Sequence, residues 1–133
     1  MFGKVNLKNF QKFKILKKLP VIGVMAVTSC GGEKPITPQQ LFQKKCGTCH
    51  SIKPGIHKIG PSLFNVIGRQ AGSTDFTEYK ALKGADFVWD KEKIAEWITD
   101  PKRYMGKPTA MTVKVKTEKN RNVLIEFLAR NGK

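Results

Sequence analysis

Two cysteines and a histidine in one short segment constrain the fold of this chain more than any other feature. The segment reads Cys46-Gly47-Thr48-Cys49-His50, and Cys-x-x-Cys-His is the attachment signature of a c-type haem. Thiols three positions apart lie on one side of a helical turn, where they can form thioethers with the two vinyl groups of the porphyrin. The motif therefore predicts one covalent haem c, attached through Cys46 and Cys49, with His50 binding the iron.

Two other chemistries use closely spaced cysteines. A thioredoxin-like redox pair follows a strand, whereas residues 39–45 before the motif predict a short amphipathic helix with Leu41 and Phe42 as its apolar positions. A structural zinc site needs two further ligands, and the chain offers only His57 and Cys30 as additional imidazole or thiol groups. The haem is therefore the favoured interpretation.

The N-terminal segment has the order of an export signal. Lysines are frequent up to Lys18, a nearly unbroken apolar run spans 19–27, and a small-residue stretch ends at Cys30. This order predicts a signal peptide over residues 1–29. The apolar run is far shorter than the roughly 20 residues that a membrane-spanning helix needs.

Cys30 has two possible fates. Val27-Thr28-Ser29-Cys30 resembles a bacterial lipobox, in which the cysteine is lipidated and becomes the mature N-terminus. The alternative is ordinary signal cleavage, which leaves a soluble periplasmic protein with a free thiol that would invite wrong disulfides in an oxidising compartment. We favour lipidation of Cys30, with residues 30–36 as a short tether and 37–133 as the folded domain.

The charge of the chain limits its partners. The 133 residues, enough for one domain, include 25 Lys and Arg against 10 Asp and Glu, which gives a formal charge of +15. No helix-turn-helix, RNP-type or zinc-finger pattern accompanies this charge, so nucleic acid is not an expected partner. Acidic protein surfaces are the expected ones.

The iron needs a second axial ligand, or an open position in a peroxidase or a ligand sensor. His57 is too near His50 along the chain to reach the opposite face of the haem comfortably. Met105 directly follows Tyr104 at the end of a helical segment, where a packing role suffices. Met111 lies in a proline-containing loop that can turn a thioether inward. Met111 is therefore the predicted ligand.

From about residue 38 to 133 the chain resembles the class I cytochromes c, of the mitochondrial and bacterial c2 type. The segments that carry the resemblance are 57–63, 67–69, 87–90, 100–104 and 108–111. The resemblance implies an all-α fold of short helices around one covalent haem, and an electron carrier rather than an enzyme. Its expected partners are acidic docking surfaces of membrane redox complexes of a respiratory or photosynthetic chain, such as a bc1-type reductase and a terminal oxidase.

The resemblance also implies roles for individual residues. The Pro61 carbonyl is expected to accept a hydrogen bond from the proximal histidine, and Thr109 is expected beside the methionine ligand. The side chains expected near the haem propionates are Arg69, Trp89 and Tyr79, the last with Phe76 as its alternative. Candidates for a basic ring around the exposed haem edge are Lys44, Lys45, Lys58, Lys102, Lys107 and Lys114.

Helices are expected near residues 37–46, 90–99 and 117–131, with short turns near 62–67 and 79–83. Pro38 stands where the family usually has a glycine in the first helix. We therefore expect this helix to begin later, with Phe42 alone packing against Leu124 and Phe127. The export signal places the domain on the periplasmic side of a bacterial membrane.

The attachment motif generates a direct prediction. Thioether bonds survive denaturation, so the haem should stay with the protein through acid-acetone extraction, and the intact mass should show one haem per chain. Haem released into the solvent would contradict attachment through Cys46 and Cys49.

Overall fold

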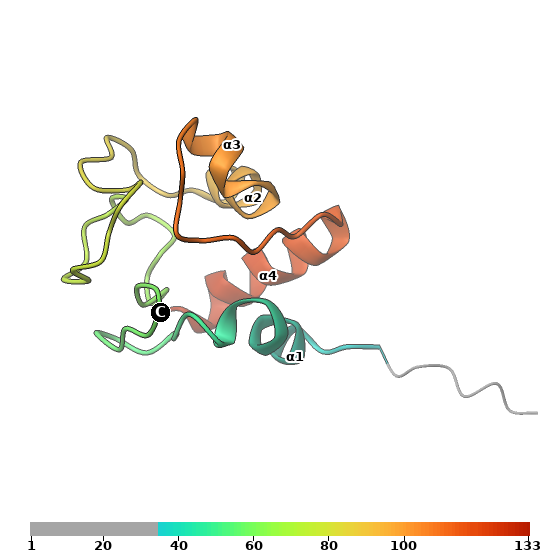
Figure 1. Cartoon of the computed structure of the whole chain (residues 1–133). Coiled ribbons are helices and arrows are strands. Elements are labelled where there is room, and N and C mark those ends of the chain that lie inside the picture. Colours follow the sequence, from blue (N-terminus) through green and yellow to red (C-terminus); the bar gives the residue numbers. More distant parts are fainter. Residues whose placement is uncertain (1–34) are drawn as a thin grey trace, which may run out of the picture. The chain divides into compact units, whose positions relative to one another are not determined.

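The computed structural model describes residues 35–133, which form one compact unit (Figure 1). The predicted signal peptide over 1–29 and the predicted lipidation of Cys30 lie outside the described residues. Within 35–133, no helix is both long enough and apolar enough to cross a membrane.

The first helix begins at Pro38 and not after it. Helix α1 spans Pro38–Phe42 and continues into the π-helical segment η1, Gln43–Gly47. Proline is accepted at the first helical position because no helical partner exists for an N–H there. Thr37 caps the helix by accepting a hydrogen bond from the Gln40 amide at 3.2 Å, and the Gln40 side chain accepts one from the Thr37 amide at 2.9 Å. This reciprocal capping corrects the expectation of a delayed start.

Two further helices follow one another without a loop. Helix α2 spans Lys91–Thr99 and helix α3 spans Pro101–Met105. Asp90 caps α2 by accepting a hydrogen bond from the Lys93 amide at 2.7 Å. Asp100 caps α3 in the same way, and its extended backbone separates the two helices. The chain leaves α3 at Gly106, whose φ is 63°. This left-handed conformation favours glycine, because a Cβ atom would clash with the backbone there.

The last helix, α4, spans Glu118–Asn131 and contacts both α1 and α2 (Figure 1). Its start at Thr117 has no side-chain cap. Leu41 and Phe42 belong to the same buried cluster as the side chains of α4, so the first helix contributes more than Phe42 to this core. The core consists of Leu41, Phe42, Val66, Ala71, Trp89, Ile94, Ile98, Val115, Leu124, Ile125, Phe127 and Leu128.

Residues 48–90 connect the first and second halves of the domain through turns. Backbone hydrogen bonds join residues 68–71 to 87–89, including Trp89 N–H to the Arg69 carbonyl at 2.9 Å. One isolated antiparallel bridge, Gln70 to Val88, lies here. The structure of 35–133 thus has helices and no extended strand, which confirms the predicted all-α class.

The contact between α1 and α4 predicts a large effect on stability. Phe42 is 1% exposed, and its ring centroid lies 5.0 Å from that of Phe127. Phe42→Ala should lower the free energy of unfolding by about 3–5 kcal/mol, because it removes buried surface and leaves a cavity. Guanidinium unfolding of the holoprotein measures this. Ile36→Ala, at a half-exposed position, should change it by no more than about 0.5 kcal/mol.

Candidate functional site

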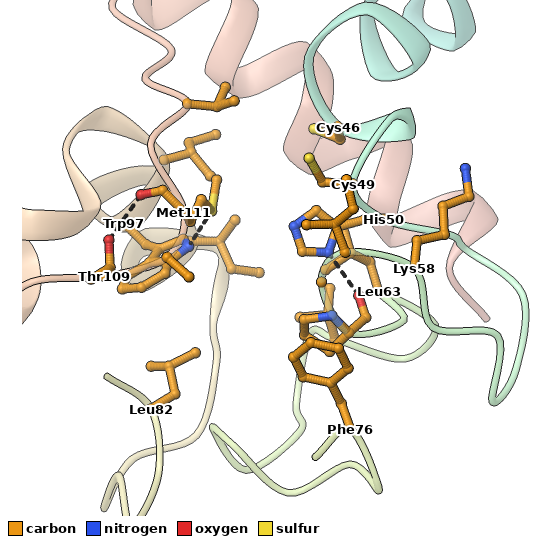
Figure 2. Close-up of a pocket in the computed structure, with 18 of the residues that line it drawn as sticks. Cys46, Cys49, His50, Lys58, Leu63, Phe76, Leu82, Trp97, Thr109 and Met111 are labelled. Atoms are coloured by element: carbon orange, nitrogen blue, oxygen red, sulfur yellow. Dashed lines mark hydrogen bonds between the residues drawn. The ribbon is translucent and has the colours of Figure 1, made fainter. Parts of the chain in front are cut away.

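A cavity of about 510 Å³ lies between the loop that follows η1 and the loop that follows α3 (Figure 2). Its volume is within the range of roughly 300–1,000 Å³ typical of cofactor sites. Every predicted site residue of the described part lines this one cavity: Cys46, Cys49, His50, Pro61, Arg69, Tyr79, Trp89, Thr109 and Met111. Residues from six separate segments are therefore brought together.

The two cysteines form one wall of the cavity. Backbone hydrogen bonds from the amides of Cys49 and His50 to the Cys46 carbonyl, at 3.0 and 2.8 Å, fold the motif into a tight turn. This turn places both sulfur atoms beside the imidazole of His50 (Figure 2). Burial raises the pKa of the Cys46 thiol to about 11, so the free thiol stays protonated at neutral pH. A thioredoxin-like pair needs the opposite, a thiol that ionises readily.

The His50 ring is held in one orientation. Its Nδ1 donates a hydrogen bond to the Pro61 carbonyl at 2.7 Å, which leaves the lone pair of Nε2 free to bind a metal. Burial lowers the pKa of His50, and the charge of Lys58 lowers it further, although the bond to Pro61 opposes both. The neutral, ligating form of the imidazole is therefore favoured.

Gly60 supports the imidazole by having no side chain. A Cβ at Gly60 would collide with the His50 ring, so this close approach of backbone to ring requires glycine. The Gly60 amide donates to the Cys49 carbonyl at 2.8 Å, which fixes residues 57–61 against the motif. His57 stabilises the same loop, because its Nδ1 accepts from the Ser62 amide at 3.0 Å and its Nε2 contacts Asp75 at 2.6 Å.

The opposite wall carries Met111, which faces His50 across the cavity (Figure 2). The Trp97 indole N–H donates to the sulfur of Met111 at 3.1 Å, and the Thr109 hydroxyl donates to the Met111 carbonyl at 2.8 Å. Val115 anchors the end of this loop through a hydrogen bond from its amide to the Ile98 carbonyl at 2.7 Å. Thr109 therefore holds the position of Met111 through a hydrogen bond to its backbone carbonyl.

Trp97 is itself held by aromatic neighbours. Its ring centroid lies 5.5 Å from that of Trp89 and 5.9 Å from that of Tyr104, both in edge-to-face geometry. Phe87 packs edge-on against Trp89 at 4.8 Å. These contacts fix the direction of the Trp97 N–H, and hence the orientation of the Met111 sulfur.

Polar groups gather at the end of the cavity formed by residues 62–79. Arg69 donates to the carbonyls of Phe64 and Ser62, the second at 2.9 Å, and burial lowers the pKa of its guanidinium. The Tyr79 hydroxyl is paired with the Thr74 hydroxyl at 2.7 Å. Phe76 lines the cavity too, packed edge-on against Tyr79 at 5.3 Å. The propionate roles of Arg69, Tyr79 and Trp89 stay a prediction.

The donor set of the cavity fits a haem. Two thiols, a neutral imidazole and a facing thioether surround a mainly apolar space, which a half-buried guanidinium and a phenol also line. Elsewhere in residues 35–133, no three His, Cys, Asp or Glu side chains gather in a way that could hold a metal ion. The fold and the site together define a small all-α protein of the c-type haem class.

Known proteins agree with this class. The chain is 36% identical over 95 residues to the cytochrome c of Theileria annulata. The aligned region covers 71% of this chain and 83% of the relative. It is 31% identical over 91 residues to the cytochrome c of Euglena viridis, covering 68% and 89%. The cytochrome c of Arabidopsis thaliana is 34% identical over 97 residues, covering 70% and 85%. No protein-family model matches the chain.

The chain belongs to the cytochrome c family. It has the all-α class I fold, binds one haem c covalently through Cys46 and Cys49, and acts as a single-haem electron-transfer protein. The predicted fold, function and cofactor are thereby confirmed. The axial pair His50 and Met111 stays a prediction.

Trp97 and Gly60 are the two functional residues that the sequence did not single out. Trp97 falls within the helix expected near 90–99, and an indole N–H is a donor that requires an acceptor when it is buried. That requirement was the available signal. Gly60 gave no signal, since its contact with the His50 ring depends on the fold of two separate segments.

Trp97→Phe should keep the ring and remove the donor to Met111. If Met111 binds the iron as predicted, its sulfur without this hydrogen bond would donate more electron density to ferric iron, and the reduction potential should fall. The expected decrease is about 20–65 mV, because a neutral hydrogen bond contributes about 0.5–1.5 kcal/mol and about 59 mV corresponds to a tenfold change for one electron. Redox titration measures it. An unchanged potential with lower thermal stability would reduce Trp97 to a packing residue.

Proposed function

We propose that this protein carries single electrons between membrane-bound redox complexes, with His50 and Met111 as the two axial ligands of its haem. The supporting observation is the arrangement of an imidazole and a thioether on opposite walls of one cavity (Figure 2). When bound, the haem supplies the one-electron couple between ferric and ferrous iron.

The protein's part in electron transfer is to keep both ligands still. His50 is fixed by Pro61 and Gly60, and Met111 is fixed by Trp97 and Thr109. Ligands whose positions are set by other groups move little when the charge at the metal changes. A small rearrangement supports rapid exchange of electrons, and a filled distal position favours a carrier over a peroxidase or a ligand sensor.

The charge distribution supports acidic partners. Residues 35–74 and 101–117 border the cavity and contain no Asp or Glu. All acidic residues of the described part lie in 75–100 and in α4. The cations of the two acid-free segments are Lys44, Lys45, Lys53, Lys58, Arg69, Lys102, Arg103, Lys107, Lys114 and Lys116.

The individual cations differ in their freedom to meet a partner. Lys45 and Lys58 line the cavity, but the Lys58 ammonium donates to the Gly47 carbonyl. Lys114 pairs with Asp100 at 2.6 Å. A field of this kind guides an acidic docking surface toward the cavity and speeds association at low salt. Bc1-type reductases and terminal oxidases are the proposed complexes.

We further propose that the chain is exported and anchored through a lipidated Cys30 on the periplasmic side of a bacterial membrane. The support is the signal-like order of residues 1–29 and the lipobox-like Val27-Thr28-Ser29-Cys30. The short tether after Cys30 would keep the domain close to its membrane, where the redox complexes are.

Met111→Ala tests the proposed ligand and separates a carrier from an enzyme. It should abolish the weak near-infrared Met–Fe(III) band, lower the reduction potential and open the iron to cyanide and peroxide. Met105→Ala is the matched control, because Met105 ends α3 and does not line the cavity; it should leave the spectrum nearly unchanged. If only Met105→Ala removes the band, the ligand assignment is wrong. If neither variant has any effect, the distal ligand is not a methionine and the carrier proposal loses its main support.

Cys30→Ala tests the anchor. The wild-type protein should need detergent for extraction from the membrane fraction, and the variant should appear in the soluble periplasmic fraction. Cell fractionation with mass analysis of the N-terminus gives the result. A soluble wild type with an unmodified N-terminus would replace lipidation by ordinary signal cleavage.

A further inference from the structure

Met111 lies in the segment that joins α3 to α4 (Figure 1). Among the backbone-to-backbone hydrogen bonds of residues 35–133, none involves residues 107–114. The first such bond after this stretch runs from the Val115 amide to the Ile98 carbonyl at 2.7 Å. Side chains must therefore hold the part of the loop that presents Met111 to the cavity.

Asp100 provides such a contact with both oxygens of its carboxylate. Its Oδ1 accepts a hydrogen bond from the Arg103 amide at 3.2 Å, which caps α3. Its Oδ2 accepts one from the Lys114 ammonium at 2.6 Å. Helix α3 leads into the loop, and Lys114 lies three residues after Met111. One carboxylate therefore joins the helix before the loop to the segment after Met111.

The place of this ion pair along the loop differs from that of the other contacts. Trp97 donates to the sulfur of Met111 itself. Arg121, on α4, donates to the carbonyls of residues 115 and 116 at 3.0 and 2.7 Å, and so acts beyond Lys114. The ion pair is the polar side-chain contact that residues 112–114 make within the described part of the chain.

The pair is partly accessible to water. The side chain of Asp100 is 30% exposed and that of Lys114 is 45% exposed. The hydrogen bond from Lys114, and after it the one from the Arg103 amide, holds the pKa of the Asp100 carboxyl below its usual range. This carboxyl is therefore ionised at neutral pH. An ion pair with this exposure makes a modest contribution that salt weakens.

We infer that Asp100 is a positioning residue for Met111, because its ion pair with Lys114 keeps the loop where the sulfur faces the imidazole. This inference rests on the proposed role of Met111 as the distal ligand. The pair can form only while residues 106–114 stay in place, since movement of the loop away from α3 separates the two charges. Its free energy therefore favours the arrangement with Met111 on the iron over the one in which Met111 has left.

The test measures the affinity of the ferric holoprotein for imidazole, which can occupy the distal position only after Met111 has left it. Lys114→Gln removes the cation, and Asp100→Asn removes the anion while asparagine remains a good helix cap. Each variant should raise the affinity for imidazole about two- to fivefold at about 0.01 M salt, the size expected for an exposed ion pair. The increase should fade at about 1 M salt, where the Debye length is about 3 Å.

The two substitutions change the net charge in opposite directions, so an equal effect identifies the pair and not the overall field. Combining Asp100→Asn with Lys114→Gln should give the affinity of either single variant, because the second substitution has no pair left to break. Lys114→Arg should retain the wild-type affinity. Lys116→Gln is the matched control, since it removes a nearby cation that forms no ion pair within residues 35–133. It should leave the affinity unchanged.

The other outcomes overturn the inference in distinguishable ways. Opposite shifts in Lys114→Gln and Asp100→Asn, or an equal increase in Lys116→Gln, would assign the effect to net charge. An unchanged imidazole affinity in both pair variants, whatever their melting temperatures, would make the pair a structural contact only, while Met111 stays the proposed ligand. If Met111→Ala itself leaves the imidazole affinity unchanged, the proposed ligand fails and the inference fails with it.

Discussion

The hydrogen bond from His50 to the Pro61 carbonyl joins the two segments on which the site depends. One segment contains the attachment cysteines, and the other contains Gly60, Pro61 and the buried Ser62. Without this bond the imidazole could rotate, although the Gly60 amide would still hold its loop against the motif through the Cys49 carbonyl. The bond also selects the tautomer, so a single 2.7 Å interaction sets both the position and the chemistry of the imidazole proposed as a ligand.

The packed helices determine how far apart the loop after η1 and the loop after α3 lie. Helices α1 and α4 pack against each other through Phe42 and Phe127, and α2 packs against α4. These helix contacts set the positions of the loop after η1 and of the loop after α3, which contains Met111. The cavity between the loops is bordered by core residues such as Leu124, Leu128 and Ile98. The cofactor therefore completes the hydrophobic core, and the chain without it should be poorly ordered.

Motifs whose chemistry is local could be predicted from the sequence. Cys46, Cys49 and His50 form a contiguous signature, and the helices at Lys91–Thr99 and Glu118–Asn131 follow from their apolar spacing. The helix was expected near 37–46 but with a delayed start, because Pro38 replaces the family's glycine; the Thr37–Gln40 capping box instead lets it begin at Pro38. The Trp97 to Met111 bond was missed because it joins a helix to a loop whose path no local pattern specifies.

The separation of charge along the chain gives the domain an electric dipole. Within residues 35–133, the segment 75–100 has seven acidic residues against four lysines, whereas 35–74 and 101–117 have cations and no acidic residue. In the field of an acidic surface a dipole experiences a torque, so the molecule rotates before it touches. Screening limits this effect to separations of about 8–10 Å at moderate ionic strength. Within that last layer of solution, an acidic partner of the proposed kind would turn the cavity toward itself, and fewer encounters would end with the wrong face in contact.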